Sequence, residues 1–202
     1  MLGMKSKNHP SAIKKRGYAL DSTDDRETPP DVFDPLDAEF HFTLDVAAAR
    51  HNAKCRRYYT RGPSPLWLPR QLSLFDEPPV GAPEALGIDG LTQPWAPGEV
   101  CWVNPPFSDI EPWVRKASDC LATVVMLLPA NRTEQPWWQE YIEPYRDMLG
   151  HSELTTRFLE GRRCFKNRGQ DIKNRTSKNP PFGVVICIWD RRENGPRAAN
   201  DS

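Results

Sequence analysis

The stretch Val100-Cys101-Trp102-Val103-Asn104-Pro105-Pro106-Phe107 decides the fold of this chain. Residues 100–103 form a short apolar run, as a buried strand does, and a helical pattern begins at Ser108. The tetrapeptide Asn104–Phe107 therefore stands where a strand ends and the chain turns into a helix. Ligand sites in open α/β sheets lie at such strand ends. This position predicts a functional site, and the alternative is a proline-rich turn that closes a strand.

The chemistry of the tetrapeptide suits an exocyclic amine, which is a poor nucleophile because its lone pair is delocalised into an aromatic ring. The side-chain oxygen of Asn104 and the carbonyl oxygen of Pro105 can each accept one N–H of such an amine. These two hydrogen bonds would localise the lone pair on the nitrogen. Pro105 and Pro106 hold the carbonyl in place at little entropic cost, and Phe107 offers a ring on which an extruded base can stack.

Strand and helix patterns alternate along the chain. Strand patterns occupy residues 42–47, 100–103, 122–129 and 184–189, and helical patterns occupy about 29–40, 108–120 and 133–149. The run 122–129 is continuously apolar, as expected of a strand that is buried on both faces. The alternation predicts an α/β fold whose sheet is partly parallel.

The first helix is predicted from its start signal and its apolar face. Thr28 is expected to be the N-cap, with Pro29 in the first turn. The apolar residues at helical spacing are Val32, Phe33, Leu36 and Phe40. Residues 42–47 then predict a short strand that ends at an acidic residue, Asp45, and residues 50–59 are expected to be helical or irregular.

Composition indicates a single domain with mobile tails and one long loop. The chain has 202 residues, of which 38% are apolar and 21 are prolines, so one domain rich in loops is expected. We expect residues 1–20 to be a flexible basic tail, residues 21–192 to form the domain, and residues 193–202 to be a second flexible tail. Within the domain, the prolines of residues 62–88 exclude a helix or a central strand and predict an inserted proline-rich loop.

Charge and cysteine content restrict the class of protein. The formal net charge is zero, so a nucleic-acid-binding surface has to come from a local basic cluster. The five cysteines form no C-x-x-C pair, which favours reduced intracellular thiols over a disulfide framework, and we expect no bound metal. The sequence contains no apolar run of membrane-spanning length and no recognisable signal peptide, so we expect a cytoplasmic protein without a membrane partner.

The tetrapeptide occurs a second time, as Asn179-Pro180-Pro181-Phe182. A basic loop precedes this copy and an apolar strand pattern follows it. The second copy therefore stands at the entrance of a strand rather than at its exit. We interpret it as a turn from loop to strand and Asn104–Phe107 as the site.

The motifs, taken in order, resemble those of DNA N6-adenine methyltransferases, and most closely the small phage-type family of DNA adenine methylases. Glu27-Thr28-Pro29-Pro30 resembles the helix start that contacts the methionine end of S-adenosylmethionine, and Leu44-Asp45-Val46-Ala47-Ala48 resembles the strand beneath this cofactor. Asp89 resembles the acidic residue that meets the adenine of the cofactor. Asn104–Phe107 matches the catalytic tetrapeptide, and Gly161-Arg162-Arg163-Cys164-Phe165 resembles a late motif of the family.

This resemblance, which covers about residues 25–190 without the 62–87 loop, implies a Rossmann-like S-adenosylmethionine-dependent methyltransferase fold. It implies direct, metal-free transfer of a methyl group from this cofactor to N6 of adenine in double-stranded DNA of a bacterium or a phage-infected host. The implied cofactor-binding residues are Thr28, Pro29, Asp45, Ala47 and Asp89, and the implied catalytic residues are Asn104, Pro105, Pro106 and Phe107.

Two departures from the family pattern leave alternatives open. Alanines replace the glycine-rich loop after the first strand, and no acidic residue occurs between Asp45 and Asp76 to bind the ribose. Asp45 can also be an ordinary strand-end acid, and Thr28 a plain helix cap. The same tetrapeptide occurs in methyltransferases that act on glutamine or on RNA adenine. A further alternative is a non-catalytic clamp-binding or DNA-binding protein on a methyltransferase fold.

Basic residues concentrate in the segment 157–178, which is our candidate for contact with DNA phosphates. The residues that we expect to bind DNA are Arg162, Arg163, Lys166 and Arg168. A solvated charged loop is the alternative.

The segment Gln71-Leu72-Ser73-Leu74-Phe75 is similar to the peptide by which many bacterial proteins bind the replicative sliding clamp. Leu72, Leu74 and Phe75 are apolar in a proline-rich loop, and Gln71 can make polar contacts. Flanking prolines keep such a segment extended and reduce the entropy lost on binding. We expect this peptide to bind the clamp, and the alternative is that it packs on the domain itself.

Overall fold

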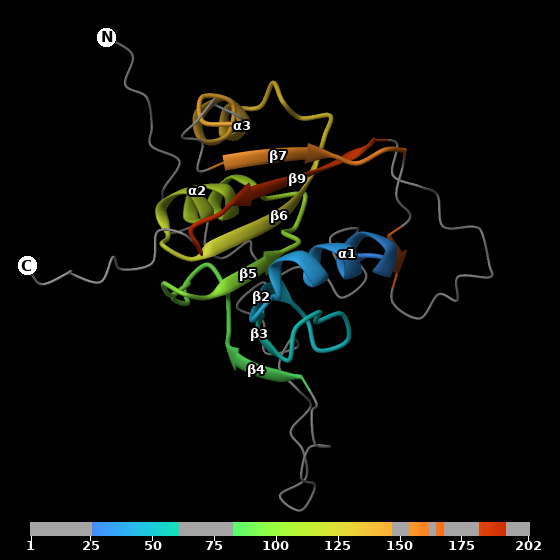
Figure 1. The fold of residues 1–202 in the computed structure, drawn as a ribbon, viewed down its shortest axis with the longest axis vertical. Coiled ribbons are helices and arrows are strands. Elements are labelled where there is room, and N and C mark those ends of the chain that lie inside the picture. The colour runs from blue at the N-terminus through green and yellow to red at the C-terminus, as the bar shows by residue number, and fades with distance from the viewer. Residues whose placement is uncertain (1–25, 61–82, 147–153, 162–164, 168–181, 193–202) are drawn as a thin grey trace, which may run out of the picture.

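The computed structural model describes residues 26–60, 83–146, 154–161, 165–167 and 182–192. Within these ranges, seven strands form one sheet in the order β4-β3-β2-β5-β6-β9-β7 (Figure 1). These strands are β2 (Leu44–Ala48), β3 (Arg57–Thr60), β4 (Glu84–Gly87), β5 (Val100–Val103), β6 (Thr123–Pro129), β7 (Leu154–Phe158) and β9 (Val184–Trp189). A separate small sheet pairs β1 (Arg26–Glu27) with β8 (Lys166–Asn167).

The strand order reverses in the middle of the large sheet. Strand β2 pairs in parallel with β3 on one side and with β5 on the other. The parallel arrangement extends to β4 and β6, whereas β9 is antiparallel to both of its neighbours, β6 and β7. The carboxyl ends of β2 and β5 therefore lie next to each other at the reversal, which is where open α/β sheets bind ligands.

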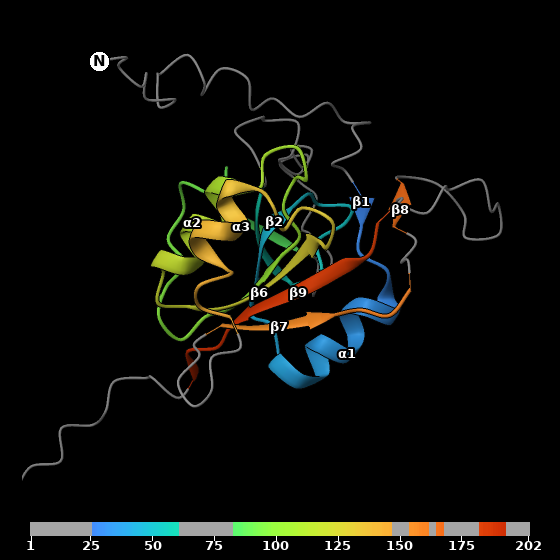
Figure 2. The same ribbon diagram turned by 90° about the horizontal axis from the view of Figure 1, so that it is seen from above.

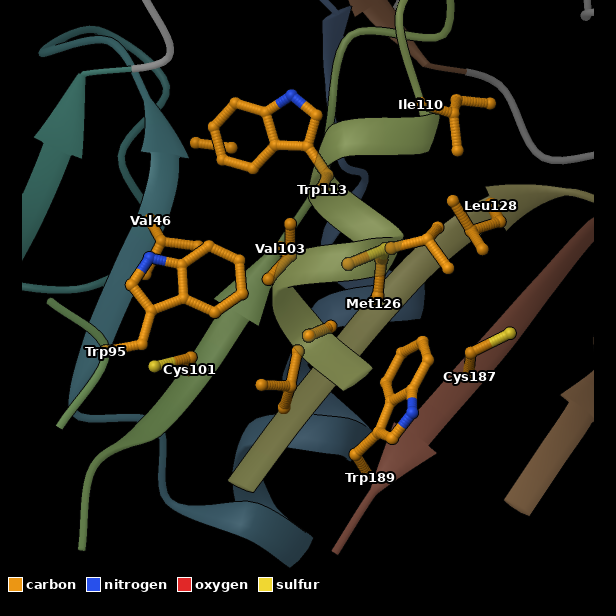
Figure 3. Close-up of a cluster of buried hydrophobic side chains, with 14 of the residues drawn as sticks. Val46, Trp95, Cys101, Val103, Ile110, Trp113, Met126, Leu128, Cys187 and Trp189 are labelled. Atoms are coloured by element: carbon orange, nitrogen blue, oxygen red, sulfur yellow. The ribbon is translucent and has the colours of Figure 1, made fainter. Parts of the chain in front are cut away.

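Helices cover both faces of the sheet. Helix α1 (Pro30–Phe40) lies on one face, and α2 (Glu111–Asp119) and α3 (Pro136–Tyr141) lie on the other (Figure 2). Successive strand residues point to opposite faces, so each strand contributes to two cores. In β6, for example, Val124, Met126 and Leu128 belong to the core beneath α2, whereas Val125 and Leu127 belong to the core beneath α1. Figure 3 shows side chains of β2, β5, β6 and β9 gathered beside Trp113 of α2.

Several predictions about the fold are confirmed. The fold is α/β with a largely parallel sheet, and the predicted strands at 100–103, 122–129 and 184–189 are β5, β6 and β9. All residues of β6 are buried, as its continuous apolar run predicted. The four apolar residues of the first predicted helix are the buried face of α1.

The structure also contains strands that the sequence did not predict. Residues 50–59 were expected to be helical or irregular, but they include most of β3. The end of the expected 62–88 loop forms the edge strand β4. Strand β7 lies mostly before the basic segment 157–178 and overlaps it only at Arg157 and Phe158. These strands are short, and β4 and β7 are partly exposed edge strands, so they lack the long apolar run that identifies a central strand.

Element boundaries differ from the predicted ones in three places. The N-cap of α1 is Pro29 without a side-chain cap hydrogen bond, so the prediction that Thr28 caps this helix was wrong. Strand β2 continues through Ala48 and does not end at Asp45, because residues 44–48 are all buried between β3 and β5. Helix α3 stops at Tyr141, three residues before Pro144, which cannot donate a helical hydrogen bond.

The described ranges contain no helix that is both long and apolar enough to cross a membrane. Nor do they contain a group of three or more His, Cys, Asp or Glu side chains placed to hold a metal ion. The expected tails, 1–20 and 193–202, lie outside the described residues, as does most of the expected proline-rich loop.

Candidate active site

One pocket lies at the carboxyl edge of the sheet, where β2 and β5 end. Its lining comes from β1, β2, the connection between β2 and β3, and the end of β5. The lining residues are Glu27, Thr28, Asp45, Ala47, Asn52, Lys54, Trp102 and Asn104. The pocket thus occupies the position at which the strand order reverses, and the reversal brings together residues that are far apart in the sequence.

Asp45 is a buried acid in the second position of β2. Its Oδ1 accepts a hydrogen bond from the backbone N–H of Ala47 at 3.2 Å, and its Oδ2 accepts one from the backbone N–H of Lys54 at 3.0 Å. Charged acceptors of this kind make stronger hydrogen bonds than neutral ones. Asp45 therefore fastens the connection after β2 to the strand and places a negative charge in the wall of the pocket.

Lys54 places a positive charge in the same pocket. Its Nζ lies 2.9 Å from Oε1 of Glu27 and 5.8 Å from the ring centroid of Phe33. The turn that carries Lys54 is held by Asn52, whose Oδ1 accepts a hydrogen bond from the backbone N–H of Ala49 at 2.7 Å. The charged groups of the lining are thus two carboxylates and one ammonium.

The tetrapeptide Asn104–Phe107 directly follows β5. Asn104 is partly exposed and lines the pocket, whereas Pro105 and Pro106 are buried. The carbonyl oxygen of Pro106 accepts a hydrogen bond from the backbone N–H of Asp109 at 3.1 Å, which closes the turn toward α2. The geometry agrees with the prediction that this copy of the tetrapeptide lies between a strand and a helix.

Phe107 belongs to a group of three aromatic rings. Its ring centroid lies 6.2 Å from that of Phe165, edge to face, and 6.0 Å from that of Phe182. Arg132, just after β6, donates a hydrogen bond from Nη1 to the Phe107 carbonyl oxygen at 2.6 Å. Phe182 is the last residue of the second tetrapeptide, so the two copies meet through their aromatic residues.

Asp89 lies near the ends of β3 and β4 but does not line the pocket. Its backbone N–H donates to Oγ1 of Thr60 at 2.9 Å, and its φ of 58° is left-handed. The next residue, Gly90, packs so closely on β2 that an added Cβ would lie 1.9 Å from the carbonyl oxygen of Val46. Only glycine fits there without displacing the backbone.

Lys116 of α2 contacts the loop that follows β4, residues 88–95, here called the Asp89 loop. Its Nζ donates hydrogen bonds to the carbonyl oxygens of Gly90 at 3.1 Å, Leu91 at 2.8 Å and Gln93, and it lies 5.1 Å from the ring centroid of Trp95. Burial lowers the pKa of Lys116. The carbonyl acceptors and the ring offset part of the cost of burying this charge, so the position of the Asp89 loop depends on Lys116.

The structure brings part of the predicted set together. Thr28, Asp45, Ala47 and Asn104 line one pocket, whereas the side chain of Phe107 packs in the aromatic group nearby. The candidate DNA-binding residues Arg162, Arg163 and Arg168 lie outside the described residues, as does the candidate clamp peptide at 71–75. Of Lys166, the structure describes the backbone, which pairs with Glu27.

Sequence reasoning gave no site role to three lining residues, which are Asn52, Lys54 and Trp102, and it quoted a fourth, Glu27, only as the first residue of the helix-start motif. Lys54 and Asn52 lie in a segment without a hydrophobic period, and Trp102 was assigned only to a buried strand. Their available signal is position, because residues that directly follow a parallel strand lie at its carboxyl edge. Recognition of β3 would have placed the 49–56 connection at that edge.

The model of the family described as DNA N-6-adenine-methyltransferase (Dam) matches residues 18–83 and 87–197 of the chain. The match is broader than the resemblance in the sequence motifs, because it includes most of the 62–87 segment. No curated protein matches the chain.

The matched residues make up most of the chain, so the chain belongs to the DNA N-6-adenine-methyltransferase (Dam) family. The name of the family indicates DNA N6-adenine methyltransferase activity.

Proposed function

We propose that this chain is a site-specific DNA methyltransferase that transfers a methyl group from S-adenosylmethionine to N6 of adenine. The observation that carries the proposal is the pocket at the ends of β2 and β5, in which Asn104 lies beside charged groups. Family membership supports the DNA substrate and the N6 position. The strand reversal between β2 and β5 supports a Rossmann-like methyltransferase fold.

The tetrapeptide acts on the amine of the target adenine. Oδ1 of Asn104 and the carbonyl oxygen of Pro105 each accept one N–H, so the lone pair of the nitrogen becomes available for attack. The rigid turn holds both acceptors before the reaction, which is how positioning and electrostatics accelerate a transfer. Phe107 and its aromatic neighbours provide a surface on which the extruded base can stack. This stacking offsets part of the cost of extrusion, which is roughly a few kcal/mol.

The charges of the pocket suit S-adenosylmethionine, whose sulfonium, ammonium and carboxylate groups sum to one positive charge. When bound, this cofactor would supply a methyl group from its sulfonium, whose sulfur departs as a neutral thioether, and the methylated amine would release one N–H proton to solvent. Two carboxylates and one ammonium in the lining provide the complementary charge. In this proposal Thr28 and Pro29 meet the methionine end, Asp45 and Ala47 lie beneath the cofactor, and the Asp89 loop meets its adenine.

DNA contact is assigned to the basic segment that follows β7. Arg162, Arg163, Lys166 and Arg168 neutralise phosphates of the duplex in this proposal. Such contacts release counterions, so DNA affinity should fall steeply as salt concentration rises. The zero net charge of the chain is compatible with this role, because the basic residues are concentrated locally.

The test is to incubate the purified chain with methyl-labelled S-adenosylmethionine and unmethylated duplex DNA, and to identify the labelled nucleoside after digestion. N6-methyladenine is the expected product. Label in RNA or protein instead of DNA would favour the glutamine or RNA-adenine alternative. Failure to bind the cofactor in calorimetry would favour a non-catalytic DNA-binding or clamp-binding protein.

The peptide Gln71-Leu72-Ser73-Leu74-Phe75 is proposed as a tether to the bacterial sliding clamp. Leu72, Leu74 and Phe75 would fill an apolar pocket of the clamp, and the tether would raise the concentration of the enzyme at newly copied DNA. Changing Leu74 and Phe75 to Ala should remove binding to immobilised clamp while methylation of short duplexes persists. Unchanged clamp binding would retire this part of the proposal.

A further inference from the structure

Glu27 and Lys54 form an ion pair inside the candidate pocket. Glu27 was named only as the first residue of the helix-start motif, and Lys54 had been assigned no role. Oε1 of Glu27 lies 2.9 Å from Nζ of Lys54, and the side chains are 34% and 14% exposed. The two residues come from β1 and from the connection between β2 and β3. Asp45 fixes the backbone of Lys54, whereas Glu27 and the ring of Phe33 contact its ammonium group.

Both charged groups retain hydrogen-bonding capacity after they pair. A lysine ammonium has three donors, and an ionised carboxylate has about four acceptor sites. A ligand can therefore bind to both groups without separating them. The ligand that matches carries a carboxylate for Lys54 and an ammonium for Glu27 at short separation, as an α-amino acid does.

We infer that Glu27 and Lys54 bind the α-amino-acid end of the cofactor, with Lys54 holding its carboxylate and Glu27 its ammonium group. The inference rests on the proposed function, because it assumes a cofactor with a methionine moiety. Asn104 lines the same pocket as the ion pair. A cofactor bound by Glu27 and Lys54 would therefore lie in the pocket that Asn104 also lines. In this inference, the ion pair positions the methyl-donating cofactor.

The experiment measures binding calorimetrically with two nucleosides that differ only at this end. S-adenosylhomocysteine contains the amino-acid end, and 5′-methylthioadenosine lacks it. Full-length wild type, Lys54→Met and Glu27→Gln are compared, with Lys54→Arg as the variant that keeps the charge. Arg57→Met is the matched control, because Arg57 and Glu99 form an ion pair that is also 2.9 Å long at the opposite edge of the sheet.

We expect Lys54→Met and Glu27→Gln each to bind S-adenosylhomocysteine about 10- to 100-fold more weakly, which is the size of a lost charged hydrogen bond. Their affinity for 5′-methylthioadenosine should stay unchanged. Lys54→Arg should retain most of the wild-type affinity, and Arg57→Met should alter neither ligand. Thermal unfolding followed by circular dichroism verifies that each variant is folded.

Two results would overturn the inference alone. One is an equal loss of affinity for both nucleosides in the Lys54 and Glu27 variants, which would mean that the ion pair only supports the fold. The other is a wild type that binds both nucleosides equally well. A wild type that binds neither nucleoside and transfers no methyl group would refute the proposed function together with the inference.

Discussion

The two edges of the sheet carry ion pairs of equal length in different surroundings. At the carboxyl edge, Lys54 and Glu27 lie 2.9 Å apart, with side chains 14% and 34% exposed. At the amino edge, Arg57 and Glu99 also lie 2.9 Å apart, with side chains 46% and 19% exposed. The first pair lines a pocket together with Asn104, whereas the second pair joins the starts of β3 and β5.

This difference shows that the distance between two charges does not define a site. At the amino edge, one oxygen of Glu99 contacts Arg57 and the other accepts a hydrogen bond from the hydroxyl of Thr43. Both oxygens of this carboxylate thus have partners within the protein. Exposed ion pairs of this kind contribute about 1 kcal/mol or less. At the carboxyl edge, the reversal of strand order places the charged residues around a pocket, where they can meet a ligand.

Replacement of Asn104 should produce the largest effect at the carboxyl edge. Asn104→Ala removes one of the two proposed acceptors for the target amine, so methyl transfer should fall about a thousandfold, as when one preorganised polar group is removed from an active site. The initial rate with duplex DNA measures this loss, and the melting temperature should stay close to that of wild type. Asn179→Ala, in the second tetrapeptide, is the control and should remain active. The reverse pattern would assign the site to the second copy.

Replacing one glycine at each edge with alanine should lower the stability of the protein by different amounts. Gly90→Ala at the carboxyl edge would place a Cβ 1.9 Å from the Val46 carbonyl oxygen, so we expect a loss of about 3 kcal/mol in the free energy of unfolding. Gly98→Ala near the amino edge meets nothing within 4 Å, and only the φ of 84° opposes it, so the loss should be about 1 kcal/mol. Urea unfolding measures both values. Equal losses would show that the close approach of Gly90 is relieved by the backbone.

Two acids provide a smaller contrast between the edges. Asp45→Asn retains the shape of a buried side chain, but its amide has only one accepting oxygen, so one of the two hydrogen bonds from the backbone N–H groups of Ala47 and Lys54 is lost. The free energy of unfolding should fall by about 2 kcal/mol, whereas Glu99→Gln at the amino edge should cost less than about 1 kcal/mol. Chemical denaturation tests the difference. A larger cost at Glu99 would mean that the amino-edge network contributes more than its exposure suggests.

The smallest predicted effect concerns a surface ion pair away from the pocket. The hydrogen bond from Arg157 holds the pKa of Glu39 below its usual value. The resulting stability is fully present above the pKa of an unfolded glutamate, about 4.3, and is lost as the pH falls through the lower folded pKa. Because both side chains are 42–44% exposed, the effect should be only a few tenths of a kcal/mol, roughly.

Glu39→Gln should therefore show a slightly weaker decline in stability between pH 7 and pH 3 than wild type does. Denaturant unfolding at a series of pH values measures the two declines. A decline in the variant as steep as in wild type would show that Glu39 contributes nothing to the acid sensitivity of the fold.

Helices and strands that form from a local sequence pattern could be predicted, whereas those that depend on contacts with distant strands could not. Strand β6 was predicted because residues 122–129 are continuously apolar, and α1 because its apolar residues repeat at helical spacing. Strand β3 was missed because its four residues, Arg57–Thr60, form a strand only between β2 and β4. Its burial comes from these neighbours and not from a local apolar pattern.

The residues of the candidate site show the same contrast between local patterns and distant contacts. Asn104 was identified because its strand, prolines and aromatic residue are contiguous in the sequence. The pairing of Glu27 with Lys54 was not identified, because this contact joins residues 27 positions apart. Asp89 was identified from a motif, but its separation from the pocket lining and the close packing of Gly90 on Val46 emerge only from the packed sheet.

By itself, the sequence determined the central buried strands, the apolar faces of α1 and α2, the turn at Asn104–Phe107 and the order of motifs that points to the family. These features depend on side-chain periodicity and backbone restrictions that act within a few residues. The tertiary structure decided which strands are neighbours, which charges meet in the pocket and which glycine is irreplaceable. Such contacts depend on pairing between distant segments, and only the complete sheet brings those segments together.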